Sequence, residues 1–203
     1  MSFQSTVSSG RDSSINSGTS STTQHQLIRI GTFTSANVAM VSNEMNRLTS
    51  KQREVIKNTF KLMQANSVYY GTSVFVRLLS EHPEYKTIWP QFRSIPDSSI
   101  VSSDALRRHA CAYMNGLKVI IDSMDDDEKL AEETYKIAKS HLKWGVRSFH
   151  LETMLPAVIA VLRVCMHRDD QLAEDAWSKL FDILAKLIEM FRAECHALIK
   201  RSL

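Results

Sequence analysis

The sequence has few of the features that mark disulfide-bonded, secreted or membrane-spanning proteins. Its three cysteines (Cys111, Cys165 and Cys195) are odd in number and widely spaced, which fits neither a disulfide framework nor a CxxC metal knuckle. The opening MSFQSTVSSG lacks the basic and apolar regions of a signal peptide, and Ser2 stands where N-myristoylation needs glycine. No apolar run is long enough to predict a membrane span. These absences predict a protein of a reducing, cytoplasmic compartment.

Motifs for phosphate binding and for nucleophilic catalysis are absent as well. The sequence has no GxGxxG or GxxxxGK[ST] loop and no GxSxG nucleophile elbow. The net charge is only +3, from 25 basic and 22 acidic residues, and it gives no reason to expect a nucleic-acid partner. We therefore expect a protein that is not an enzyme and does not bind nucleic acid.

Residues 1–46 differ in composition from the rest of the chain. The stretch SSINSGTSSTTQHQ is polar and nearly free of apolar side chains, so it cannot bury enough surface to offset the entropy lost on ordering. LIRIGTF (27–33) is slightly more apolar and leaves a contact with the domain open. We predict a Ser/Thr-rich disordered extension over 1–46, either a solvated tail or a segment that binds a protein partner. One domain follows over 47–203.

From Leu48 onward, apolar residues recur at helical spacing. Thr49 and Gln52 predict a capping box at the first helix, Gly145 predicts a break, and Pro156 predicts a kink or a late helix start. No strand alternation or hairpin dipeptide occurs after Leu48, so the domain is predicted to be all-α. The further helices are expected over about 67–80, in HPEYKTIWPQF, over about 103–123, from MDDDEKLAEE to about 141, and over about 150–167 and 171–200.

Two of these predicted helices carry a histidine on the apolar side. His109 shares a stripe with Leu106 and Tyr113, and His141 shares one with Thr134 and Ile137. A buried imidazole has to satisfy both nitrogens, so two of them on separate helices indicate a shared partner such as iron. Zinc is less well supported, because no further Cys or His lies at the usual short spacing. Core histidines with ordinary hydrogen-bond partners remain the alternative.

The order of these signals resembles the globin family over about residues 48–200. YYGTSVFVRLLSEHPEYKTIWPQF resembles the second and third globin helices, LRRHACAYMNGLKVIID the helix with the distal histidine, and IAKSHLKWGV the proximal helix and its corner. The spacing between His109 and His141 matches that of neuroglobin-like members. The resemblance implies an all-α globin fold, with helices A to H around a pocket for haem b (iron protoporphyrin IX).

The resemblance also implies roles for individual residues. His141 matches the proximal position, which binds the haem iron, and His109 matches the distal position. Ser140 matches a position that orients the proximal imidazole through a hydrogen bond. The other residues that match haem-pocket positions are apolar or aromatic, and packing in an ordinary core would explain them equally well. These further expected haem-pocket residues are Phe75, Trp89, Phe92, Tyr113, Ile137, Val146, Leu151 and Met154.

Departures from the usual family pattern concern the distal side. Many nematode-type oxygen binders carry tyrosine and glutamine where this sequence has Phe75 and His109, which is the neuroglobin-like pair. Tyr113 and Trp89 stand where valine and phenylalanine are usual, so we expect a crowded distal space. The sequence therefore predicts a nematode-type globin with a six-coordinate, bis-histidine haem, acting in electron transfer or redox sensing with a small redox partner. The alternatives are binding of O2, CO or NO for storage, transport or sensing, and a haem-free interaction module.

Overall fold

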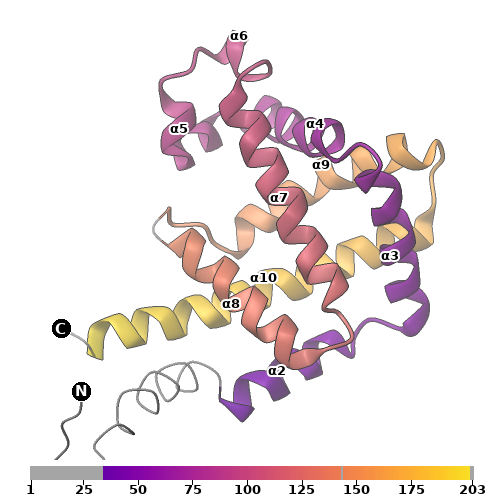
Figure 1. Ribbon diagram of the computed structural model, residues 1–203, viewed down its shortest axis with the longest axis vertical. Helices are drawn as coiled ribbons and strands as arrows, with labels where there is room; N and C mark the ends of the chain where they lie inside the picture. The colour runs from indigo at the N-terminus through magenta and orange to yellow at the C-terminus, as the bar shows by residue number, and fades with distance from the viewer. Residues whose placement is uncertain (1–33, 143, 202–203) are drawn as a thin grey trace, which may run out of the picture. The chain divides into compact units, whose positions relative to one another are not determined.

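The structure, a computed structural model, describes residues 34–142 and 144–201. Within these ranges it contains α-helices, one 3-10 helix and no strand, which confirms the predicted all-α fold (Figure 1). The elements in chain order are α2 (Ser35–Met45), α3 (Ser50–Gln64), α4 (Ser67–Glu81), the 3-10 helix η1 (Pro83–Ile88), α5 (Pro90–Arg93), α6 (Asp97–Ile100), α7 (Asp104–Asp122), α8 (Asp127–Leu142), α9 (Ser148–Met166) and α10 (Gln171–Arg201).

Local side-chain chemistry explains where several helices begin. Thr49 Oγ1 accepts from the Gln52 amide at 3.2 Å and the Gln52 side chain accepts from the Thr49 amide at 3.1 Å, which confirms the predicted capping box. Ser103 Oγ caps α7 by accepting from the Leu106 amide at 3.2 Å. The acidic run before α8 caps that helix, because an Asp126 carboxylate oxygen accepts a hydrogen bond from the backbone amide of Lys129 at 3.0 Å.

Glycine and proline mark the end of α8 and the course of α9. Helix α8 ends at Leu142, and Gly145 has φ +68°, a left-handed conformation that glycine adopts without a Cβ clash. This confirms the predicted break. Helix α9 continues through Pro156, so the alternative of a late start does not apply. By length and composition alone, α9 also meets the criteria for a membrane-spanning helix. A core helix passes the same test, and α9 packs on α4 and α10.

The helical domain begins earlier than residue 47. A compact unit starts at Ser35, and residues Ser35–Met45 form α2, which packs on α8 and α10. The expectation of a disordered extension therefore has to be corrected for this segment, because one face of the short helix is buried. Residues 1–33 of the predicted extension lie outside the described residues.

The long helix α10 supplies much of the core, because it packs on α3, α8 and α9 (Figure 1). Trp177 is completely buried and donates its indole N–H to Thr59 Oγ1 at 2.9 Å, which ties α10 to α3. An apolar stripe along α10 is buried, and its members are Trp177, Leu180, Phe181, Leu184, Leu187, Ile188 and Phe191. Burial of this apolar face against neighbouring helices holds α10 in the core.

Helices α4 and α7 approach closely at Gly71. A Cβ added at this position would lie 2.8 Å from Met114 Cγ and 3.1 Å from the Ala110 carbonyl oxygen. We expect Gly71→Ala to lower the free energy of unfolding, because overpacking costs about 1–3 kcal/mol against a gain of about 1 kcal/mol in helix propensity. Gly116→Ala is the control, since its added Cβ would meet only Ile137 Cδ1 at 4.0 Å. Denaturant titration of both variants measures the difference, and equal stability would contradict the expected clash.

Candidate functional site

A cavity of about 310 Å³ lies among α4, η1, α7, α8, α9 and α10. Its walls are mostly apolar, with few polar atoms, and they bring together residues from nearly the whole helical domain. Every predicted site residue except Phe92 lines this cavity. These residues are Phe75, Trp89, His109, Tyr113, Ile137, Ser140, His141, Val146, Leu151 and Met154. The two inward-facing histidines of the sequence therefore meet in one apolar chamber.

His141 is held in one orientation by its own helix. Its Nδ1 lies 2.8 Å from the Ile137 carbonyl oxygen and 3.1 Å from Ser140 Oγ, and Ser140 Oγ donates to the same carbonyl at 2.8 Å. Because the carbonyl accepts only, Nδ1 carries the proton, and Nε2 keeps its lone pair. A hydrogen bond of this kind fixes both the tautomer and the ring direction of a metal-binding histidine.

His109 enters the cavity from α7 and is enclosed by aromatic rings. Its ring centroid lies 4.8 Å from that of Phe75, 5.1 Å from that of Trp89 and 5.7 Å from that of Phe92, all in edge-to-face contact. Burial, and in addition the charge of His141, lower the pKa of His109 to about 4. The imidazole of His109 is therefore neutral near pH 7 and has a lone pair for a metal.

Phe92 takes a different place from the other predicted residues. It is completely buried but does not line the cavity, and its ring lies 5.5 Å from that of Trp89. It stands behind Trp89 and His109 and supports both rings. The sequence identified it as a pocket residue because it closely follows Trp89, but the turn into α5 directs it into the packing behind the wall.

Three polar atoms of the cavity wall are buried and have no hydrogen-bond partner within the part of the chain that the structure describes. They are the indole Nε1 of Trp89, the phenol oxygen of Tyr113 and Oγ1 of Thr134. Burial also raises the pKa of the Tyr113 phenol above its ordinary value, so the group stays protonated and can donate. Unsatisfied buried polar groups are costly, so these three atoms indicate a cavity that holds a further molecule.

Sequence reasoning missed several cavity residues. The most informative is His150, at the start of α9, whose Nδ1 accepts from the Arg147 amide at 2.9 Å, so its Nε2 carries the proton at the wall. No helical stripe includes His150, because it precedes the apolar part of α9. The other missed residues carry no sequence signal that separates a cavity wall from ordinary packing, and they are Leu78, Tyr85, Ile88, Ala112, Gly116, Leu117, Ile120, Thr134, Phe181, Leu184 and Ile188.

The arrangement fits a large apolar metal cofactor better than a bare metal ion. Among the described residues no group of three or more His, Cys, Asp or Glu side chains could hold a metal ion. Two imidazoles, from α7 and α8, line one apolar chamber and could bind the metal of a cofactor that brings its remaining ligands with it. This donor set and these walls fit haem.

Comparison with known proteins agrees with this arrangement. The family model described as Globin matches residues 72–188, more than half of the 203 residues. Cytoglobin-1 of Oryzias latipes is 27% identical over 141 residues, covering 68% of this chain and 79% of that protein. A globin of Nerita albicilla is 23% identical over 148 residues, covering 71% and 93%. A myoglobin of Heterodontus portusjacksoni is 22% identical over 148 residues, covering 70% and 95%.

Proposed function

This chain belongs to the globin family, and we propose that the cavity takes up haem b, whose iron His141 and His109 would bind. The observation that carries the proposal is the state of the His141 ring. Its Nδ1 is engaged by the Ile137 carbonyl, so Nε2 is the nitrogen left to bind a metal. Ile137 and Met154 would pack against the porphyrin, and Ser140 would hold the orientation of the proximal ring.

His109 as the second ligand is supported by its surroundings. The edges of Phe75, Trp89 and Phe92 leave the imidazole little room to turn away from the cavity. Its lowered pKa keeps the ring neutral, so no proton has to be removed before the lone pair binds a metal near pH 7. An internal ligand that is already in place competes with any diffusing gas.

The function that follows is electron transfer or redox sensing. Haem, when bound, supplies an iron that gains or loses one electron. With both histidines as ligands, neither side chain has to move far during that exchange. The partner would be a small redox protein, and residues 1–33 are the segment for a further protein partner. All three cysteines are free thiols, which supports a reducing, cytoplasmic setting.

Binding of O2, CO or NO is the second candidate function, and two wall atoms favour it. The buried hydroxyl of Tyr113 and the indole N–H of Trp89 have no partner among the described residues, and both line the cavity that also holds His109. Either group could donate a hydrogen bond to a gas if His109 swung away.

Absorption spectra of the purified, haem-loaded protein separate these functions. We expect low-spin bis-histidine bands in both the ferric and the ferrous states, because both imidazoles line one cavity and His141 Nδ1 is already engaged by the Ile137 carbonyl. A five-coordinate ferrous spectrum would favour gas binding. Absence of a Soret band after reconstitution would instead support a haem-free interaction module whose cavity serves another purpose.

A further inference from the structure

Helix α8, which carries His141, is held from outside by a helix that precedes the family-matched residues 72–188. This helix is α2, and its buried side chains, Asn37, Val41 and Met45, recur every four residues along one face. Val41 and Met45 are 0% exposed. Figure 1 shows α2 beside α8 and α10, the two helices on which it packs.

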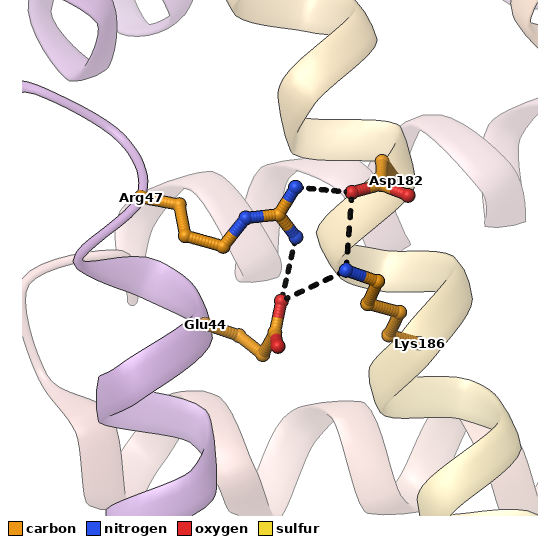
Figure 2. Close-up of polar contacts among 4 residues, drawn as sticks. All are labelled: Glu44, Arg47, Asp182 and Lys186. Carbon is orange, nitrogen blue, oxygen red and sulfur yellow. Dashed lines mark hydrogen bonds and ion pairs between the residues drawn. The ribbon is translucent and has the colours of Figure 1, made fainter.

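A ring of four charged side chains joins the end of α2 to α10 (Figure 2). Arg47 lies 2.6 Å from a Glu44 carboxylate oxygen and 2.5 Å from one of Asp182, and Lys186 lies 3.7 Å and 3.6 Å from the same two carboxylates. Each pair is partly exposed, so each alone contributes little to stability. As a closed ring, however, the four charges specify one register of α2 on α10.

Two further contacts fasten α2 at both ends. Near its start, the Asn37 amide donates to a Glu194 carboxylate oxygen at 2.9 Å. At its end, the guanidinium of Arg53 donates to the Met45 carbonyl at 2.7 Å and also to the carbonyl of Met124, in the turn just before α8. One side chain of α3 thus binds the last carbonyl of α2 and the turn that leads into the His141 helix.

The position of His141 depends on the packing of α8 rather than on the corner that follows it. A Cβ added at Gly145 would meet no atom within 4 Å, so this corner is open. Away from the cavity, α8 buries Ala131, Tyr135 and Ala138. The small side chains of Ala131 and Ala138 let neighbouring helices approach closely, and α2 and α10 both pack on α8.

We propose that α2 is a positioning element of the haem site, and that Val41 and Met45 act on the iron by holding α8 and therefore His141 in place. The inference rests on the proposed function only in taking His141 as an iron ligand. Loosening α2 would let α8 shift or open, which weakens the hold of His141 on haem. A segment before the family-matched region thereby sets the strength of the proximal bond.

The test uses the full chain with one buried and one exposed substitution on α2. Val41→Glu places a charge on the buried face, whereas Met40→Glu alters a side chain that is 49% exposed on the same helix. In haem-free protein, amide hydrogen exchange over 127–142 should be at least about tenfold faster in Val41→Glu and unchanged in Met40→Glu. Equal exchange over α8 in the two variants would overturn the inference.

A second readout separates positioning from general loss of stability. In haem-loaded protein, Val41→Glu should release haem at least about tenfold faster and shift the ferrous iron–histidine stretching band, measured with His109→Leu as the background. Thr59→Val, which breaks the remote bond to Trp177, should lower stability without moving that band. A shift of equal size in Thr59→Val would contradict positioning by α2.

Milder substitution covers the case in which Val41→Glu does not fold. Val41→Ala should speed exchange in 35–45 and 127–142 together while leaving α4 and α9 unchanged, and Val41→Ile should restore protection. Uniformly faster exchange in all helices would contradict the inference. If the unmodified protein takes up no haem, the proposed function fails, and the exchange experiment on haem-free protein still decides the role of α2.

Discussion

Replacing His141 with alanine is expected to yield protein with little bound haem and a lower melting temperature. The substitution removes an imidazole whose Nδ1 is held by a backbone carbonyl, which leaves Nε2 for a metal. A ligand that binds only the folded state at a hundredfold above its Kd stabilises that state by about 2.7 kcal/mol, and this contribution would be lost. The ratio of Soret to protein absorbance and a thermal melt measure the two effects.

The matched control for this experiment is an exposed histidine of another helix. His196→Ala alters α10 at a site that does not line the cavity, so haem content and melting temperature should stay unchanged. Retention of haem with an unaltered spectrum in His141→Ala would show that another residue binds the iron, and it would remove the main support for the proposed site.

Replacing His109 with leucine is expected to convert the ferrous spectrum to five-coordinate and to speed CO binding on the order of a hundredfold. The estimate supposes that about 99% of the molecules have His109 bound, because the apparent affinity for a gas is reduced by the fraction of open molecules. Leucine retains bulk within the ring of Phe75, Trp89 and Phe92 but has no lone pair. Flash photolysis of CO measures the rate.

Two further variants sharpen this experiment. Tyr113→Val in the His109→Leu background should raise the CO rate again, since it removes a ring whose centroid lies 5.3 Å from that of Phe75. His150→Leu changes another histidine of the cavity wall and should leave the six-coordinate spectrum intact. Stable, reversible O2 binding by the unmodified protein would contradict the bis-histidine proposal and favour the gas-binding function.

The core of the site could be predicted because it depends on the helical repeat. Side chains three or four residues apart lie on the same face of a helix. His109 and Tyr113 therefore face the core together with Leu106, and His141 faces it together with Ile137. The hydrogen bond from His141 to Ile137 is also local, since it spans one turn. Resemblance to globins then added Trp89 and the other expected pocket residues, all of which line the cavity except Phe92.

Other parts of the site could not be predicted, because their signals are weak or not local. His150 stands outside any apolar stripe, and only the folded corner brings it to the cavity wall. Phe92 follows Trp89 closely, yet the backbone turn at Trp89 directs it behind the wall. Residues that line a cavity and residues that fill a core recur with the same helical periodicity. The apolar stripe of α10 therefore could not show that Phe181 lines the cavity.

By itself the sequence determined the helical class, the helix starts and the two histidines that face inward, because capping and periodicity act over one or two turns. Only the tertiary structure decided that Ser35–Met45 form a helix of the domain. That segment is short and mixes polar with apolar residues, and it is held by Asp182, Lys186 and Glu194, which lie more than 130 residues away along the chain. Burial of Val41 and Met45 depends on surfaces that exist only after α8 and α10 have packed, and no local pattern encodes such surfaces.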